Sequence, residues 1–387
     1  MFPVTLDSAV NIAFPAISAA FAVPVSAIQW IVIAYILTDA CLILPAGRLA
    51  DRVGHRRVFA AGLAITGTAL LLCGTARSFG GLLAARALQG AGAALVFGSA
   101  PALVTLATPE ALRQRALGWF NLAFGVGIVV GPLLGGVLVA AWSWRAVYLV
   151  RVPLAALALL LTRRLRPALA PAPAARPAPA APGGVADRRT FVLANAANLV
   201  ANAALFFVWL LVPYYLIQIR GLPVATAGLL FAVGSLATAL GAPAGSRWAD
   251  AWGARRVVPL ALAAEAAGLA LTSRLDAGSS AAAITLALVL TGGGMGLFTV
   301  PNMHYVMSAL PRARQGWAGG LVVLMRMLGI VVGARVATFA YEGRLALHRA
   351  ADLDAAAVAF RDAFVVAAGI GAVAVLLSLV PPRRPAA

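Results

Sequence analysis

Asp7 and Arg86 are charged residues inside long apolar runs, where a charge is expensive to keep. Asn11 follows Asp7 by four residues, so a helix would place both side chains on one face. Burial disfavours the ionised form of a carboxyl group and favours proton binding. We therefore expect Asp7 to bind a proton in one conformation and to release it in another. The alternative is a fixed structural pair or an interfacial cap near the start of the chain.

Arg86 is followed by Gln89 in a run too apolar to solvate a guanidinium group. A buried guanidinium must find an anion or hydrogen-bond acceptors. Arg86 could tune proton binding at Asp7 or Asp39, bind an anionic substrate, or form a permanent ion pair. We assign Asp7, Arg86 and Asp39 to a proton-coupling site.

Other charges also fall inside apolar runs, and arginine is in surplus. Glu265 is expected to have a structural partner, Arg326 or Arg335. The surplus argues against assuming a cationic substrate. The sequence leaves the roles of four residues open: Arg151, Glu265, Arg326 and Arg335.

Twelve apolar runs must position these groups. Hydrophobic residues make up 62% of the 387 residues and charged residues 11%, whereas soluble domains average roughly 25% charged. A membrane span needs about 20 mostly apolar residues, so the sequence predicts an all-α integral membrane protein. The predicted spans are residues 2–21, 27–47, 58–76, 79–107, 116–140, 143–162, 190–219, 224–246, 257–274, 281–308, 316–340 and 361–380.

A stretch rich in proline, alanine and arginine separates spans six and seven. Residues 163–189 hold six arginines and a tract from Pro167 to Pro182, which is typical of an extended linker. The sequence thus predicts an N-terminal six-helix bundle over residues 1–162, a cytoplasmic linker over 163–189, and a C-terminal six-helix bundle over 190–387.

A charged motif follows span two and recurs after span eight. The shared core is Ala-Asp-x-x-Gly-x-Arg-Arg-Val, with Asp51 and Asp250 separated by 199 positions. Copies at the same place in two hydrophobic halves indicate an internal duplication. Asp51 could accept hydrogen bonds from a nearby helix N-terminus, or the motif could be a basic loop that only sets orientation. Its residues are Gly47, Asp51, Arg52, Gly54, Arg56 and Arg57 in the first copy and Asp250 and Gly253 in the second.

All 30 basic residues are arginine, and their distribution orients the protein. With both termini in the cytoplasm, the cytoplasmic segments hold nineteen arginines and the outer segments seven. This bias is typical of cytoplasmic loops and predicts a multi-pass protein of the inner (plasma) membrane. A nucleic-acid footprint would need a clustered basic face, and the sequence does not indicate one.

Two spans carry patterned faces. Span five has small residues at four-residue spacing, where another helix can approach closely. Span seven has three asparagines on one face, which we expect to line a central cavity. The predicted strip is Gly127, Gly131, Pro132, Gly135 and Gly136. The predicted cavity residues are Asn11, Gln89, Asn195, Asn198, Asn202, Asn302 and Tyr305.

The chain resembles the major facilitator superfamily of transporters, and within it the drug/proton antiporters. The resemblance covers nearly the whole chain. The matching motifs are Leu6-Asp7-x-x-x-Asn11-x-x-x-Pro15, Gly47-x-x-x-Asp51-Arg52-x-Gly54-x-Arg56-Arg57, Arg86-x-x-Gln89-Gly90, Gly127-x-x-x-Gly131-Pro132-x-x-Gly135-Gly136 and Trp144-Arg145 through Pro153.

The resemblance assigns roles to two of these motifs. It implies that Asp51 latches onto the start of span eleven, near Gly316. It also implies that the span-five strip seals the outer side and is associated with antiport. The chain departs from this branch in three ways. It has twelve spans rather than fourteen, a start that we expect to be shortened before Asp7, and Arg151 where the branch usually has a neutral asparagine.

The resemblance implies two pseudo-symmetric six-helix bundles and proton-coupled export of amphipathic small molecules or drugs by alternating access. A metabolite facilitator or symporter is the alternative, followed by a transport-inactive membrane sensor or scaffold. The sequence contains no phosphate-binding Gly-x-x-x-x-Gly-Lys motif and no metal-ligand spacing. We therefore expect no enzyme activity and no cofactor. The expected partners are a small-molecule substrate, protons and the lipid bilayer, with a monomeric protein and no nucleic acid.

Overall fold

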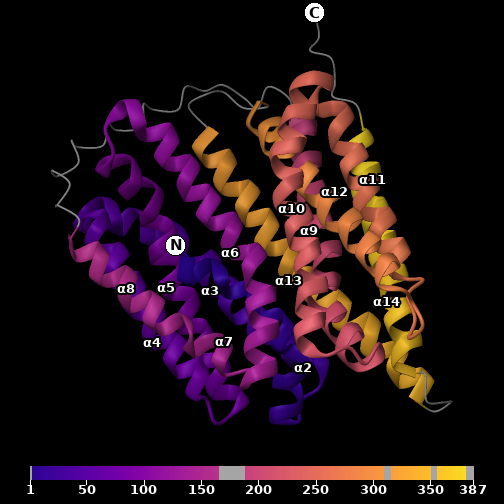
Figure 1. Cartoon of the computed structure of the whole chain (residues 1–387). Coiled ribbons are helices and arrows are strands. Elements are labelled where there is room, and N and C mark those ends of the chain that lie inside the picture. The colour runs from indigo at the N-terminus through magenta and orange to yellow at the C-terminus, as the bar shows by residue number, and fades with distance from the viewer. Residues whose placement is uncertain (1, 165–187, 309–314, 350–354, 381–387) are drawn as a thin grey trace, which may run out of the picture. The chain divides into compact units, whose positions relative to one another are not determined.

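The computed structural model describes residues 2–164, 188–308, 315–349 and 355–380. These residues form helices joined by short connections and contain no strand (Figure 1). The all-α fold expected from the sequence is confirmed.

The first half of the chain begins with a broken helix. A short 3₁₀ turn separates two α-helical pieces of the first span, and the sixth span is likewise made of two pieces. The helices are α1 (Phe2–Thr5), η1 (Leu6–Ser8), α2 (Ala9–Phe21), α3 (Val25–Val53), α4 (His55–Thr75), α5 (Phe79–Ala107), η2 (Glu110–Leu112), α6 (Arg113–Ala141), α7 (Ala146–Leu149) and α8 (Arg151–Arg164).

The second half repeats this order after the linker. Its first helix is followed by one turn of π-helix, which begins two residues after Pro213. The helices are α9 (Arg188–Tyr214), η3 (Tyr215–Ile219), α10 (Val224–Trp252), α11 (Ala254–Thr272), α12 (Ala281–Ser308), α13 (Gln315–Arg349) and α14 (Ala355–Leu379).

The helical segments account for all twelve predicted spans. Nine of them are long and apolar enough to cross a membrane within the described residues, and two shorter apolar helices cover Leu6–Phe21 and Ala146–Thr162. The twelfth is α11, which is 19 residues long and carries Glu265 in its interior.

The duplicated motif forms two equivalent one-residue turns. Gly54 connects α3 to α4 at φ +99°, and Gly253 connects α10 to α11 at φ +82°. Only glycine adopts such backbone angles readily. The predicted ends of spans two and eight, at 47 and 246, are too early, because each helix continues into the charged residues. Alanine, leucine and arginine are good helix formers, so the helix does not end with the apolar run.

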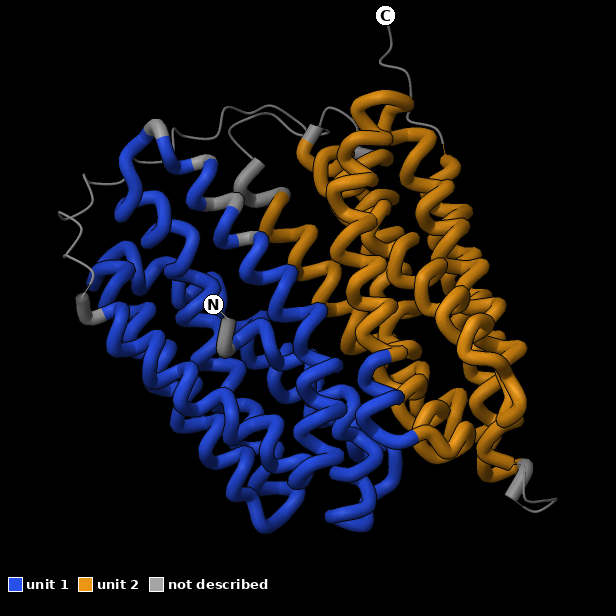
Figure 2. Tube along the Cα trace, viewed as in Figure 1, with its two compact units in different colours: residues 1–175, 223–229 blue, residues 176–222, 230–387 orange. Residues whose placement is uncertain are grey.

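Two units divide the chain (Figure 2). Unit 1 comprises residues 1–175 and 223–229, and unit 2 comprises 176–222 and 230–387. In unit 1, α5 packs against α3 and α4, while α2 packs against α6. In unit 2, α11 packs against α12 and α14, and α9 packs against α13. The domain bounds proposed from the sequence stay a prediction, since most of the linker lies outside the described residues.

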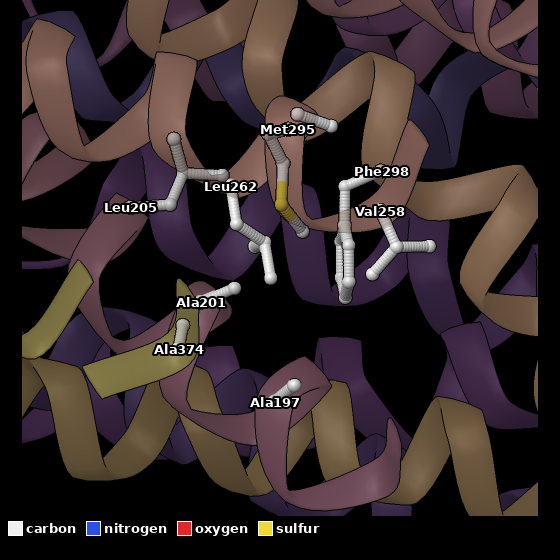
Figure 3. Close-up of a cluster of buried hydrophobic side chains, with 9 residues drawn as sticks. Ala197, Ala201, Leu205, Val258, Leu262, Met295, Phe298 and Ala374 are labelled. Carbon is white, nitrogen blue, oxygen red and sulfur yellow. The ribbon is translucent and has the colours of Figure 1, made fainter. Parts of the chain in front are cut away.

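Each unit has its own apolar core. In unit 1, Val4, Tyr35 and Leu63 are buried with Ala93 and Val96. In unit 2, α9, α11, α12 and α14 meet around a cluster that Figure 3 shows. We call this the unit 2 cluster; it consists of Ala197, Ala201, Leu205, Val258, Ala261, Leu262, Met295, Phe298 and Ala374.

Candidate functional site: a charged cluster inside unit 1

Asp7 lies in the 3₁₀ turn that interrupts the first span. Leu6–Ser8 form this turn, between α1 and α2. Such a turn within a longer helix often marks a functional or strained position. The next residue fixes the turn against α6, because the hydroxyl of Ser8 donates a hydrogen bond to the carbonyl of Ile128 at 3.0 Å.

Arg86 of α5 binds the Asp7 carboxylate with both ends of its guanidinium group. Nη1 donates to Oδ1 and Nη2 donates to Oδ2, each at 2.8 Å. Gln89, one turn along α5, donates from Nε2 to Oδ1 at 3.0 Å. Parallel charge-assisted bonds of this kind are among the strongest in proteins. The sequence placed these three residues in two separate motifs, and the structure brings them together.

Arg151 is a third partner of the same carboxylate. It begins α8, is 1% exposed, and donates from Nη1 to Asp7 Oδ1 at 3.0 Å. The sequence left its role open, and the only signal was its departure from the neutral residue of the resembled branch. Two guanidinium groups on one carboxylate offset the cost of burying that carboxylate as an anion. The sequence argument considered burial and Arg86 but did not identify this second cation.

Arg86 is also anchored to α3. Its Nε donates to the carbonyl of Ile31 at 2.9 Å, and its Cζ lies 4.6 Å from the ring centroid of Tyr35. Nη1 additionally bonds Gln89 Oε1 at 2.7 Å. A carboxylate, a backbone carbonyl, an amide and an aromatic face thus surround the guanidinium, which is 1% exposed. Several elements of unit 1 therefore fix its position.

The glycine strip of α6 packs against the segment that carries Asp7. A Cβ at Gly131 would lie 3.0 Å from the backbone nitrogen of Ala9, and one at Gly135 would lie 2.6 Å from the Ala9 carbonyl oxygen. A Cβ at Gly127 would collide with the Thr5 side chain. The close helix approach expected from the spacing is present, and the partner is the first span. The sequence could not identify this partner.

The end of the strip meets residues 223–229, which belong to unit 1. A Cβ at Gly136 would lie 2.9 Å from the Val224 carbonyl oxygen and 3.0 Å from the Cα of Gly228. The carbonyl of Pro132 approaches Gly228 in the same way. The backbones touch here because neither helix carries a side chain at the contact.

Asn11 and Asp39 are not among the residues that hydrogen-bond to the Asp7 carboxylate, which are Arg86, Gln89 and Arg151. Both are buried, at 9% and 3% exposure. Within the described residues, no hydrogen bond joins Asn11 to Asp7, and the 3₁₀ turn that contains Asp7 lies between the two helical pieces. The ion pair of Arg86 is with Asp7 and does not include Asp39. A coupling role for Asp39 stays a prediction.

The side chains of the three asparagines of α9 are buried rather than exposed to solvent. Asn198 donates to the carbonyl of Val322 in α13 at 2.8 Å, and Asn202 donates to the carbonyl of Asn198 at 2.8 Å. Asn195 donates to Phe191 within its own helix. Each is 4–5% exposed. Of this polar face, Asn198 thus links α9 to α13, while the bonds of Asn195 and Asn202 stay within α9. Cavity lining by the three asparagines stays a prediction.

Asn302 and Tyr305 of α12 line a small pocket in unit 2. Asn302 is 1% exposed, and its Oδ1 has no hydrogen-bond partner. The other residues that line the pocket are Thr190, Leu193, Ala194, Ala197, Ala254, Arg255, Val258, Leu377, Ser378 and Val380.

The first copy of the charged motif is exposed at the end of α3. Asp51 is largely exposed and lies 3.4 Å from Nε2 of His55, across the Gly54 turn. Gly47 faces Gly98 of α5, where a Cβ would lie 3.7 Å from the carbonyl oxygen. Arg52 and Arg57 are exposed, as is Asp250 in the second copy. The latch stays a proposal.

The expected partner of Glu265 is absent. Neither carboxyl oxygen of Glu265 has a hydrogen-bond partner, and no ion pair joins it to Arg326 or Arg335 in the part of the chain that the structure describes. Arg335 is exposed, whereas Glu265 is 1% exposed. The prediction of a structural ion pair is therefore wrong, because the carboxyl oxygens of Glu265 contact neither arginine and Arg335 lies at the surface.

Comparisons with known proteins agree with this architecture. A family model described as the Major Facilitator Superfamily matches residues 4–207 and again 194–387. The chain is 30% identical to the multidrug resistance protein Stp of Mycobacterium tuberculosis, across 87% of this chain and 73% of that protein. It is 24% identical to the riboflavin transporter RibZ of Clostridioides difficile, across 86% and 84%.

A solved structure shares the fold. It is a bacterial homologue of the human lysosomal transporter Spinster in an inward-facing, unoccupied conformation. The two chains superpose with a TM-score of 0.80 at 17% identity, over 98% of this chain and 94% of the other. At this identity the likeness concerns the fold alone.

Proposed function

The chain belongs to the major facilitator superfamily, and on this premise we propose that it exports amphipathic small molecules in exchange for protons. It is a multi-pass membrane transporter, and its relatives are transporters rather than enzymes. The proposal adds the direction, the proton coupling, the drug-like substrates and a location in the inner membrane.

The Asp7 cluster carries this proposal. A carboxylate inside a membrane span is by default a functional candidate. Arg86 donates to both oxygens of Asp7, and these bonds are strong because the carboxylate is ionised. A proton on Asp7 removes that charge and weakens the pair, so proton binding and the Asp7–Arg86 pair disfavour one another. The Asp7–Arg86 pair joins the first span to α5. Protonation of Asp7 would weaken this contact and so shift the balance between conformations.

The glycine strip connects this exchange to movement of the helices. Gly131 and Gly135 press on Ala9, two residues after Asp7. A change in the Asp7–Arg86 pair that moves the first span would therefore also move α6, because the glycines of α6 contact the backbone of Ala9 directly. Alternating access in this superfamily rests on rocking of the two repeats. Resemblance of the strip to the antiporter motif supports exchange rather than facilitation.

Everted membrane vesicles from a pump-deficient bacterium test the proposal. An acidic vesicle interior should drive accumulation of ethidium in vesicles that contain the protein. A protonophore should abolish this accumulation, and vesicles without the protein should show none. Accumulation that a protonophore leaves unchanged would rule out proton coupling.

A metabolite facilitator is the second candidate, and similarity to the riboflavin transporter supports it. In that case the same vesicles should equilibrate riboflavin without a pH gradient and should not concentrate ethidium. Parallel measurement of riboflavin and ethidium in one preparation separates the two functions.

A further inference from the structure

Unit 2 contains a buried acid that the Asp7 cluster does not use. Glu265 lies in the middle of α11 and is 1% exposed. Neither Oε1 nor Oε2 has a hydrogen-bond partner. Keeping an unpaired carboxylate at such a position costs several kcal/mol, so the neutral, protonated acid is the favoured form.

The surroundings of Glu265 are apolar and closely packed. A Cβ at Gly294 of α12 would lie 2.5 Å from the Glu265 backbone nitrogen, so α12 passes directly over it. Ala261 and Leu262, one turn earlier on α11, belong to the unit 2 cluster, in which Figure 3 labels Leu262. On α14, Gly371 packs against Ala266.

No described helix that packs on α11 places a charge beside Glu265. On α12 and α14, the titratable residues lie ten or more positions from Gly294 and nine or more from Gly371, or about 14–15 Å along a helix. On α9 they lie near the two ends of the helix, away from Leu205 in the cluster. These residues are His304 and Tyr305 on α12, Arg361 and Asp362 on α14, and Arg188, Arg189 and Tyr214 on α9.

The internal repeat shows that packing at this position does not require an acid. Glu265 follows Thr66 by 199 residues, the same offset that relates Asp250 to Asp51. Thr66 is 0% exposed on α4, and a Cβ at Gly92 of α5 would lie 2.8 Å from its backbone nitrogen. A glycine of the neighbouring helix thus packs against threonine in unit 1 and against glutamate in unit 2. Helix packing alone therefore does not explain why a carboxyl group is present at this position.

A route to water begins two turns away on the same face of α11. Val258 lines the pocket that also contains Asn302, and Val258 precedes Glu265 by seven residues. Val258 and Ala197 belong both to this pocket and to the unit 2 cluster. Apolar side chains of the cluster thus separate the acid from the pocket. Movement of these side chains would open the acid to water.

We propose that Glu265 is a second proton-binding site, which holds its proton in the described conformation and exchanges it with water through the pocket at Val258 and Asn302. The proton-binding claim stands on the geometry of unit 2. Its use in transport rests on the proposed function, and it would raise the number of protons exchanged per substrate.

Infrared difference spectroscopy of the full-length protein in lipid nanodiscs tests proton binding without any transport. Wild type and Asp7→Asn should show the carbonyl band of a buried carboxylic acid, and Glu265→Gln and Glu265→Thr should lack it. The band should shift in D₂O and disappear as the pH rises from about 5 to about 10, an interval in which buried carboxyl groups titrate. Absence of the band in wild type, or a band insensitive to both D₂O and pH, would overturn the proposal. The threonine variant copies Thr66 and guards against misfolding of the glutamine variant.

Proteoliposomes test the use of this proton in transport. The accumulation ratio of ethidium is measured against an imposed pH difference. If the wild type exchanges two protons per substrate, the ratio should be about a hundredfold per pH unit. Glu265→Gln would exchange one proton, so its ratio should fall to about tenfold per pH unit. An unchanged ratio would overturn the coupling role. If wild type shows no dependence on the pH difference, the proposed antiport fails, and the infrared result alone decides whether Glu265 binds an exchangeable proton.

Discussion

Arg86 and Asp7 are joined by two parallel hydrogen bonds, Nη1 to Oδ1 and Nη2 to Oδ2, each 2.8 Å long. The two residues are 79 positions apart and lie in different helices of unit 1. Arg151 adds a third arginine nitrogen at 3.0 Å. The carboxylate is therefore both the candidate proton site and the counter-ion that holds two buried cations.

Asp7→Asn should abolish concentrative export of ethidium. Asparagine cannot bind and release a proton, and it leaves two buried guanidinium groups without their anion. Breaking a buried pair by removing one partner costs about 3–5 kcal/mol, so the variant should also melt at a lower temperature. Everted-vesicle uptake and thermal unfolding of the purified protein measure the two effects separately.

The double variant Asp7→Asn/Arg151→Asn separates coupling from stability. Removing Arg151 takes away one of the two cations that Asp7 neutralises. The double variant should therefore melt at a higher temperature than Asp7→Asn alone. Concentrative export should not return, because no proton-binding group is restored. Recovery of both stability and export in the double variant would mean that Asp7 is only a structural counter-ion.

Arg86→Lys should reduce export while preserving the charge. A lysine ammonium cannot make two parallel bonds to Asp7 and also reach the Ile31 carbonyl. Loss of one hydrogen bond to a charged group costs about 1.5–3 kcal/mol, which corresponds to about tenfold or more in rate if it is lost in the rate-limiting step. Initial rates of ethidium uptake measure this. A rate equal to wild type would show that charge alone is needed.

Gly131→Ala should impair export, because its methyl group would overlap the hydroxyl oxygen of Ser8, next to Asp7, and would lie 3.0 Å from the backbone nitrogen of Ala9. Gly125→Ala is the matched control, since a Cβ at Gly125, six residues earlier on α6, meets nothing within 4 Å. The control should transport normally and be equally or slightly more stable, because alanine favours helix. Equal effects of the two changes would show that helix propensity, and not contact with the first span, matters at the strip.

The sequence was sufficient to find the charged residues and the fold, because each signal is local. Asp7 and Arg86 each stand out in an apolar run, and Gly54 and Gly253 each lie within a repeated charged motif. The twelve spans follow from length and apolarity. None of these signals requires knowledge of which spans touch.

Pairing between spans could not be predicted, because it depends on three-dimensional packing. Arg151 is 144 positions from Asp7, and its sequence context contains no sign of that contact. The lack of an ion pair at Glu265 could not be predicted either, because α13 contains arginines and the sequence does not show that they do not contact Glu265. The hydrogen bond from Asn198 to the carbonyl of Val322 could not be predicted for the same reason.

Gly54→Ala and Gly253→Ala should each destabilise the protein. Their φ angles of +99° and +82° are strained for any residue with a Cβ, at a cost of about 1–3 kcal/mol. Gly320→Ala is the control, because it lies inside α13 with nothing within 4 Å of a Cβ. Thermal unfolding should show lower midpoints for the two turn variants alone. Unchanged midpoints would indicate that the turns relax to ordinary backbone angles.

Asp51→Asn should slow ethidium export more than Asp250→Asn does. Both acids are exposed and precede an equivalent glycine turn, so simple loss of surface charge would affect them alike. Asp51 differs in its contact with His55, which is 9% exposed at the start of α4, and in the arginine that follows it directly. If this copy dominates a latch, its neutralisation alters the conformational balance, whereas loss of Asp250 has a smaller effect. Initial uptake rates at matched expression measure the difference. Equal rates for the two variants would assign the motif to membrane orientation instead.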